Sequence, residues 1–290
     1  MPETYEVRPA SKPIDARVRP PGSKSITNRA LVCAALAEGT SRLSGALDSD
    51  DTRVMIAAMQ KLGINIDAAD SETTLTVEGC GGRIPAASAE LFVGNSGTTV
   101  RFLTAMLTLG HGRFRLDGAP RMRERPIGDL ADALNQLGAR VRCESPGGCP
   151  PVAIDAAGLP GGKATIGGAI SSQYLSGLLM AAPHAKQPVR LAVDGQLVSK
   201  PYVHMTAGVM QAFGVGVGAG GMGGGVGFDA DMRSFEVAVG GYEAADYAIE
   251  PDASAASYFW AAAAITGGRV VVDGLSPDAL QGDVAFVDCL

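Results

Sequence analysis

The sequence repeats one pattern at an interval of about 75 residues. Three expected helices end in an apolar residue followed by glycine, at Gly63, Gly138 and Gly214. The first two of these glycines are 75 residues apart, and the second and third are 76 apart. A glycine just past a helix end supplies a left-handed cap, and so long an interval indicates duplicated supersecondary units, not a solenoid of short repeats. We therefore predict at least three copies of one unit.

Each copy contains the same series of elements. An apolar helix is followed by a glycine turn and a short strand, after which a turn rich in Ser, Asp and Pro leads into a second helix and two more strands. Each copy thus mixes two helices with three strands, so we predict an α+β fold. The strands expected after the first helices are Ser41–Ser44, Arg113–Leu116 and Val189–Val193.

The first helix of each unit is apolar nearly all round. The three apolar runs are Ala30–Leu36, Phe102–Leu107 and Tyr174–Met180. A helix without a polar face is buried, so we predict strands on the outside and a shared bundle of helices inside. The amino ends of these helices can reach the surface only at the ends of the bundle.

Small polar residues and cations stand at the starts of these buried helices. The three starts are Pro21–Arg29, Gly94–Arg101 and Ile170–Gln173. Helix N-termini carry free N–H groups and partial positive charge, and such ends bind phosphate or carboxylate groups. The sequence therefore predicts that the helix starts converge on a multiply anionic small molecule.

A fourth unit begins at Asp252 and is expected to continue through a strand at Arg269–Val272 to a second helix near Gly282. The repeat places the next helix-ending glycine at position 290, where the sequence stops at Leu290. We therefore expect one complete three-unit domain followed by an incomplete second one, in a chain that is a fragment of a longer protein. A naturally shorter protein is the alternative.

Composition excludes several functional classes. The 290 residues carry a net charge of −6, which gives no basic surface for nucleic acid, and no apolar run is long enough to span a membrane. The N-terminus lacks the pattern of a signal peptide. Five cysteines without metal-ligand spacing predict reduced thiols and a cytoplasmic protein. No metal site is expected, because helix capping explains Asp48, Asp50 and Asp51 better than metal binding does.

A glycine-rich run at residues 214–227 has the composition of a phosphate-binding loop. It lacks the Gly-Lys-Ser/Thr ending of such a loop, and no helix is expected after it. We predict instead a loop before a strand at Phe235–Val239.

Eight motifs together resemble one known family, the 5-enolpyruvylshikimate-3-phosphate synthases, and they occur in that family's order along the whole chain. They are Pro21–Ser25, Asn28-Arg29, Leu47–Asp51, Gly94–Thr98, Pro120–Ile127, Ser171–Gln173, Leu197–Tyr202 and Gln281–Asp283. The resemblance implies a fold of two α/β prisms, each made of three βαβαββ units. It implies a first domain at residues 21–243 and a truncated second domain at residues 244–290. Residues 1–20 are expected to belong with the second domain.

The resemblance also implies an activity. Shikimate 3-phosphate attacks phosphoenolpyruvate through its 5-hydroxyl, a tetrahedral intermediate forms, and phosphate leaves. This chemistry needs clustered cations, N–H donors and an acid/base pair, and it implies neither a metal nor an organic cofactor. The expected partners are the two small-molecule substrates, with no nucleic acid and no membrane, for a protein expected to be a monomer.

The motif match assigns roles residue by residue. It implies that Ser171, Ser172 and Ser199 bind the phosphate of shikimate 3-phosphate, and that Ser25, Arg29 and Tyr202 hold its ring and carboxylate. Gln173 and Asp283 are also expected to contact this substrate. It implies that Lys24, Gly97, Arg125 and Gln173 contact phosphoenolpyruvate. Lys24 and Asp283 are the expected catalytic residues, with Asp283 accepting the proton of the 5-hydroxyl.

Some of these residues also have a purely structural explanation. Ser25 and Ser171 can be ordinary helix caps, since capping and ligand binding use the same geometry. Arg125 can be a solvated residue of a turn, and Asp283 can cap a helix.

Two other functions remain open. The related enzymes that transfer enolpyruvyl to a UDP-amino sugar share the fold, but they carry a reactive cysteine near the Arg-rich turn, and residues 118–125 contain none. A noncatalytic anion-binding or scaffold module is the second alternative. A comparison of how the chain binds shikimate 3-phosphate and UDP-N-acetylglucosamine distinguishes these possibilities.

We predict that this chain alone turns over little or no substrate. The resemblance implies that the rest of the second domain supplies further cationic and acid/base groups around phosphoenolpyruvate, and without them the transition-state charge is poorly stabilised. Phosphate release from the two substrates measures this activity. Release at an ordinary enzyme rate would contradict the prediction.

Overall fold

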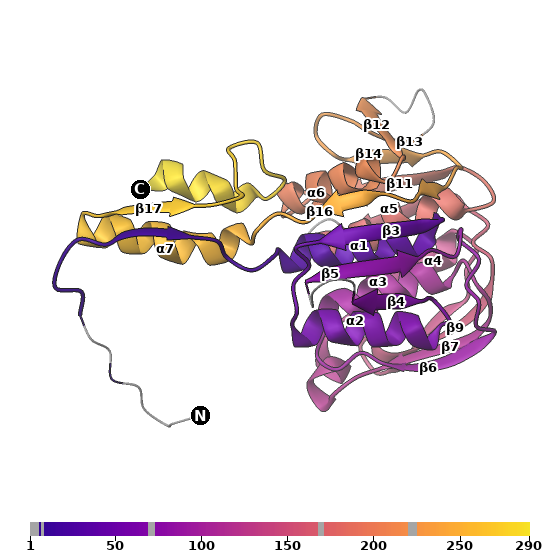
Figure 1. Cartoon of the computed structure of the whole chain (residues 1–290). Coiled ribbons are helices and arrows are strands. Elements are labelled where there is room, and N and C mark those ends of the chain that lie inside the picture. Colours follow the sequence, from indigo (N-terminus) through magenta and orange to yellow (C-terminus); the bar gives the residue numbers. More distant parts are fainter. Residues whose placement is uncertain (1–5, 7–8, 69–72, 168–170, 220–224) are drawn as a thin grey trace.

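Three β-sheets surround a group of buried helices (Figure 1). The computed structural model describes residue 6 and residues 9–68, 73–167, 171–219 and 225–290. Ile170, which belongs to one of the expected helix starts, lies outside the described residues. The mixed α+β composition predicted from the repeat is confirmed, with helices and strands alternating along the chain.

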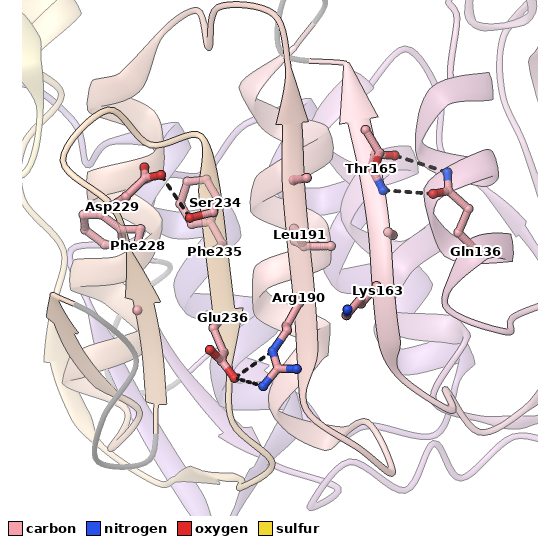
Figure 2. A pocket seen from close by; sticks show the side chains of 13 residues that line it. Gln136, Lys163, Thr165, Arg190, Leu191, Phe228, Asp229, Ser234, Phe235 and Glu236 are labelled. Atoms are coloured by element: carbon pink, nitrogen blue, oxygen red, sulfur yellow. Dashed lines mark hydrogen bonds and ion pairs between the residues drawn. The ribbon is translucent and has the colours of Figure 1, made fainter.

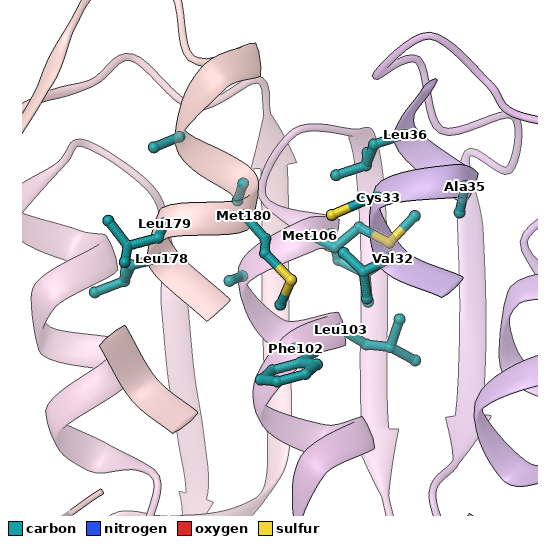
Figure 3. Packing of buried hydrophobic residues seen from close by; sticks show 14 of the residues in the cluster. Val32, Cys33, Ala35, Leu36, Phe102, Leu103, Met106, Leu178, Leu179 and Met180 are labelled. Carbon is teal, nitrogen blue, oxygen red and sulfur yellow. The ribbon is translucent and has the colours of Figure 1, made fainter. Parts of the chain in front are cut away.

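The central helices are the three that the sequence predicted to be buried: α1 (Lys24–Leu36), α3 (Gly97–Leu107) and α5 (Ser172–Ala181). Every α1 residue from Ile26 to Leu36 is buried, which agrees with its lack of a polar face. Figure 3 shows Cys33 of α1, Met106 of α3 and Met180 of α5 in one packed cluster. Burial of one such side chain stabilises the fold by roughly 1.5–3 kcal/mol.

The second helix of each unit packs against this centre with one face. These helices are α2 (Asp50–Lys61), α4 (Gly128–Gln136) and α6 (Lys200–Ala212). Short 3₁₀ helices, η1 (Pro120–Glu124) and η2 (Ala182–His184), follow β7 and α5. Gly63 and Gly138 have positive φ angles of 85° and 87°, and Gly214 has 88°, so all three helix-ending glycines adopt the expected left-handed conformation.

The sheets tie the units into a ring. In two sheets, a strand from the preceding unit pairs in parallel with the first strand of the next unit. These pairs are β6 (Ser88–Phe92) with β7 (His111–Asp117), and β10 (Gly162–Gly167) with β11 (Val189–Asp194). In the remaining sheet the late strand β16 (Asp246–Ala248) pairs in parallel with β3 (Thr40–Ser44), which returns the chain to its first unit. The sheet orders are β16-β3-β5 (Thr74–Glu78)-β4 (Ile66–Ala68), β6 (Ser88–Phe92)-β7 (His111–Asp117)-β9 (Cys149–Ala157)-β8 (Val141–Ser145), and β10 (Gly162–Gly167)-β11 (Val189–Asp194)-β14 (Ser234–Val237)-β13 (Gly225–Phe228)-β12 (Gly216–Ala219).

The last part of the chain extends to one side of this body (Figure 1). It contains α7 (Ala253–Thr266), β17 (Arg269–Val272) and the 3₁₀ helix η3 (Gly282–Cys289), and β17 pairs in parallel with β1 (Asp15–Val18) from the other end of the chain. A two-residue pairing between β2 (Ala37–Glu38) and β15 (Tyr242–Glu243) lies near the junction.

Two expectations need correction. The second helix expected near Gly282 is a 3₁₀ helix in which no residue is buried, so it lacks the packed face that stabilises a longer α-helix. The glycine-rich loop expected at residues 214–227 contains strands β12 and β13 at its two ends, because pairing within the sheet overrides the low strand propensity of glycine. Residues 220–224 of that run lie outside the described residues.

Within the described part of the chain, no helix combines the length and the apolar character needed to cross a lipid bilayer.

Leu103 of α3 has no exposed surface, and we predict that Leu103→Ala lowers the free energy of unfolding by about 3 kcal/mol, because it leaves a cavity in a packed core. Ile265 of α7 is 84% exposed, and we expect Ile265→Ala to change the same quantity by no more than about 0.5 kcal/mol. Urea denaturation compares the two variants. Equal effects would show that the centre of the bundle is not the stabilising core.

Candidate active site

A cavity of about 280 Å³ lies where the amino ends of several helices meet. The start of α1 contributes Ser23 and Ser25, and the start of α6 contributes Ser199 and Tyr202. The remaining wall comes from the start of α7 and from η3, and it includes Asp252, Ser254, Gln281, Gly282 and Asp283. Four residues selected from the sequence, Ser25, Ser199, Tyr202 and Asp283, therefore line one cavity.

Ser23 is a cavity residue that the sequence reasoning did not select. It occupies the N-cap position of α1, yet its side chain makes no capping hydrogen bond. The residue is 1% exposed, and its Oγ has no hydrogen-bond partner among the described residues. A buried hydroxyl without a partner is costly, so this group is available to a ligand in the cavity. In the sequence, its position directly before Lys24 was the feature that pointed to a role for Ser23 in ligand binding.

Ser199 adopts a backbone conformation that serine rarely takes. Its φ and ψ angles are 57° and 43°, in the left-handed region, at the N-cap of α6. Its exposed side chain makes no capping hydrogen bond. A non-glycine residue in this conformation costs about 1–2 kcal/mol, and such strain concentrates at functional sites. The conformation leaves the hydroxyl free beside the first turn of α6.

Arg29 lies fully buried beneath this cavity. Its Nη1 donates to the carbonyl oxygen of Ser25 at 2.8 Å, and its Nε donates to Thr206 Oγ1 at 2.7 Å. The guanidinium carbon also lies 5.3 Å from the ring centroid of Phe102 and 5.9 Å from that of Tyr202. Burial lowers the pKa of the Arg29 guanidinium to about 10, so the group stays charged at neutral pH.

A second group of side chains gathers at the start of α3. Arg101 Nη1 donates to Gln173 Oε1 at 2.6 Å, and Gln173 Nε2 donates to Thr98 Oγ1 at 3.3 Å. A methyl group on Gly97 would lie 2.8 Å from Arg125 Nη1 and 3.1 Å from Arg101 Nη1, so both guanidinium groups rest against this glycine. Burial lowers the pKa of Arg101, and the nearby charge of Arg125 lowers it further.

These arginines share one property. Among the described residues, no carboxylate lies within ion-pair distance of Arg29, Arg101 or Arg125. Elsewhere the arginines pair readily, as Arg123 does with Asp117. In a chain of net charge −6, these cations, which lack ion-pair partners and lie near the starts of α1 and α3, form a local positive field. The arrangement favours an anionic ligand.

The remaining predicted residues lie around these two groups. Ser171 is the N-cap of α5, and its Oγ accepts from the backbone N–H of Gln173 at 3.2 Å, while Ser172 is buried in the first turn. Lys24 Nζ lies 3.6 Å from Asp51 Oδ2 in a partly exposed pair, which is worth little. Lys24, Gly97, Arg125 and Ser171 are not part of the wall of the 280 Å³ cavity. The structure therefore shows two neighbouring groups connected through the helix starts, not one enclosed pocket.

Asp283 faces the cavity from η3. Its Oδ2 accepts a short hydrogen bond from Ser254 Oγ, and its negative charge contributes to raising the pKa of Tyr202, after the larger effect of burial. Asp252 is a second carboxylate on the same wall, where it caps α7 through Ala255 N at 2.9 Å. From the sequence alone, a contact of Asp252 with a ligand could not be distinguished from capping of the helix that follows it.

A larger groove of about 670 Å³ lies on the outer face of the sheet that contains β10, β11 and β14 (Figure 2). Two of its charged groups pair with each other, since Arg190 Nη2 lies 2.8 Å from Glu236 Oε1. The Gln136 side chain pairs with the backbone of Thr165 at the strand edge. Size alone does not make this groove the anion site, because no helix N-terminus opens into it.

No group of His, Cys, Asp and Glu side chains suited to a metal ion occurs within the described ranges of the chain.

Comparison with known proteins shows that this sequence is similar to one family over most of its length. The sequence model of EPSP synthase (3-phosphoshikimate 1-carboxyvinyltransferase) matches residues 9–290. A 3-phosphoshikimate 1-carboxyvinyltransferase of Shewanella denitrificans is 49% identical over 280 residues, covering 96% of this chain and 63% of the relative. The corresponding protein of Marinomonas sp. is 46% identical over 284 residues, covering 97% and 64%. The chain thus spans less than two thirds of the length of these relatives.

A solved structure shows the same fold. EPSP synthase from Acinetobacter baumannii superimposes with a TM-score of 0.79 at 26% sequence identity, covering 93% of this chain and 57% of that one.

The strain at Ser199 gives a stability prediction. Glycine adopts the left-handed conformation without penalty, so we expect Ser199→Gly to be about 1 kcal/mol more stable than Ser199→Ala, which loses the same hydroxyl but keeps the strain. Urea denaturation of the two variants measures the difference. If the alanine variant is the more stable one, residue 199 does not hold a strained conformation in solution.

Proposed function

The chain belongs to the EPSP synthase family, and we propose that the helix N-termini around its cavity bind shikimate 3-phosphate. The corresponding reaction transfers the enolpyruvyl group of phosphoenolpyruvate to the 5-hydroxyl of this acceptor, giving 5-enolpyruvylshikimate 3-phosphate and phosphate. The family match over residues 9–290 and relatives named 3-phosphoshikimate 1-carboxyvinyltransferase support the proposal. The partners are these two small molecules.

The observation that carries the proposal is a small polar cavity above a buried, unpaired cation. Shikimate 3-phosphate presents a phosphate, a carboxylate and hydroxyl groups on a compact ring. The cavity offers hydroxyl donors from Ser23, Ser25, Ser199 and Tyr202, together with backbone N–H groups in the first turn of α1. The charge of Arg29 lies directly below and attracts an anion, and no carboxylate among the described residues forms an ion pair with it, although Asp252 and Asp283 stand on the cavity wall.

We assign the contacts by chemistry. Ser199, Ser171 and Ser172 donate to the phosphate, since each stands at a helix start where N–H groups also point outward. Ser25 and Tyr202 hold the ring, and the Arg29 guanidinium supports both of them from beneath. Gln173 lies between the two groups of residues and serves both substrates.

Phosphoenolpyruvate binds beside Gly97 in this proposal. Gly97 lets the start of α3 approach the ligand closely, Arg125 matches a carboxylate with its two parallel N–H donors, and Lys24 supplies a compact charge for phosphate. As the 5-hydroxyl oxygen loses its proton and bonds to the central carbon, the methylene carbon takes up a proton, which gives a tetrahedral intermediate. This intermediate then expels phosphate while its methyl group loses a proton, and the carbon–carbon double bond of the enolpyruvyl group re-forms. Preorganised cations lower the free energy of these charged states.

Asp283 as the group that accepts the 5-hydroxyl proton stays a prediction. Its carboxylate faces the cavity and is hydrogen-bonded to Ser254, but Asp252 shares the same wall. The division of the chain into a first domain at residues 21–243 and a second at 244–290 also stays a proposal. The parallel pairing of β1 with β17 supports grouping residues 1–20 with the second.

Calorimetric titration with shikimate 3-phosphate tests the proposal. We expect binding, and we expect Ser199→Ala to weaken it about tenfold through loss of a hydrogen bond to a charged group. Ser88→Ala is the matched control, because Ser88 is exposed at the start of β6, away from the cavity. UDP-N-acetylglucosamine should give no binding heat. Binding of that nucleotide sugar instead would indicate the related transferase, and binding of neither would favour a scaffold.

A further inference from the structure

Two buried hydroxyl groups lie beneath the cavity without an assigned role. Ser176 of α5 and Thr206 of α6 both have no exposed surface. Thr206 Oγ1 lies 2.8 Å from Ser176 Oγ, so the two hydroxyls join the neighbouring helices. Both accept from Arg29: its Nε lies 2.7 Å from Thr206 Oγ1, and its Nη2 lies 3.2 Å from Ser176 Oγ.

The opposite side of the same guanidinium reaches the cavity wall. Arg29 Nη1 donates to the Ser25 carbonyl oxygen at 2.8 Å, and Nη2 donates to the Tyr202 carbonyl oxygen at 3.3 Å. Ser25 and Tyr202 both line the cavity, one from α1 and the other from α6. The guanidinium is planar and its N–H directions are fixed, so the position of the group sets the spacing of the two walls.

A hydrogen bond within α6 explains only one of the contacts of the Thr206 hydroxyl. A helical threonine often donates to the carbonyl four residues earlier, and Thr206 Oγ1 does lie 2.8 Å from the Tyr202 carbonyl oxygen. The hydroxyl has one hydrogen, which goes either to that carbonyl or to Ser176 Oγ. In both cases an oxygen lone pair remains for Arg29 Nε. Valine has the same shape and lacks this lone pair.

The charge of Arg29 makes this acceptor pair important. Within the described ranges no carboxylate forms an ion pair with Arg29. This buried cation is instead held by hydrogen-bond acceptors and by the Phe102 and Tyr202 rings. Removing one acceptor therefore lets the guanidinium shift, and the carbonyls of Ser25 and Tyr202 shift with it.

We infer that Thr206 and Ser176 are positioning residues of the anion cavity. They fix the Arg29 guanidinium, which in turn holds Ser25 and Tyr202 at the spacing that shikimate 3-phosphate requires. This inference rests on the proposed function for its ligand, and on the structure alone for the coupling between the hydroxyl pair and the cavity wall.

The test compares three substitutions in the full chain by calorimetry with shikimate 3-phosphate. Thr206→Val should bind about tenfold more weakly, because a buried donor of Arg29 loses its partner. Thr206→Ser keeps the hydroxyl and should restore affinity to within about twofold. Thr104→Val is the matched control: Thr104 lies in α3 with no exposed surface, and its Oγ1 has no partner among the described residues.

A spectroscopic readout separates positioning from a general loss of stability and needs no ligand. In ¹H–¹⁵N spectra of the free chain, Thr206→Val should move the Arg29 Nε–H signal together with the backbone amide signals of Ser25 and Tyr202. Thr104→Val should leave these three signals in place. If Thr206→Val does not fold, Ser176→Ala replaces it, since that change removes the longer of the two contacts with Arg29.

The outcomes are distinct. Unchanged signals of Ser25 and Tyr202 in a folded Thr206→Val protein overturn the inference, and so does an equal loss of affinity in Thr104→Val. If the wild-type chain does not bind shikimate 3-phosphate, the proposed function fails, while the spectra still decide whether the hydroxyl pair positions the cavity wall.

Discussion

The burial of helices that are apolar on every side determines this architecture. Because α1, α3 and α5 have no polar face to expose, strands must enclose them, and three sheets do so in a ring that β16 closes onto β3. Enclosed helices reach the surface only at their ends. The helix starts therefore gather at the ends of the bundle, and the anion site that we propose follows from the same constraint that builds the core.

One buried charge in the candidate site, the Arg29 guanidinium, is unusual for a protein interior. Arg29 is buried without an ion-pair partner among the described residues, and it is held by hydroxyl and carbonyl acceptors and by the Phe102 and Tyr202 rings. Such a group is costly in the empty protein and becomes favourable when an anion binds above it. The left-handed Ser199 adds strain at the same cavity. Both features reduce stability where a ligand can restore it, which is typical of a binding site.

Much of the fold could be predicted from the sequence. The 75-residue repeat, the burial of α1 and the strand at Arg269–Val272 all follow from hydrophobic pattern and glycine position, and the structure confirms them. Ser176 and Thr206 were missed because a hydroxyl in an apolar helix resembles any other small core residue. Their importance depends on which neighbouring helix they face, and that depends on packing across units far apart in sequence.

The central claim is that helix starts from separate units form one anion site, and amide chemical-shift mapping during titration with shikimate 3-phosphate tests it most directly. The account predicts that the largest shifts fall on backbone amides at the starts of α1, α5 and α6, around Ser25, Gln173 and Tyr202. Shifts confined to the outer groove around Lys163 and Arg190, or scattered over unrelated surfaces, would contradict it.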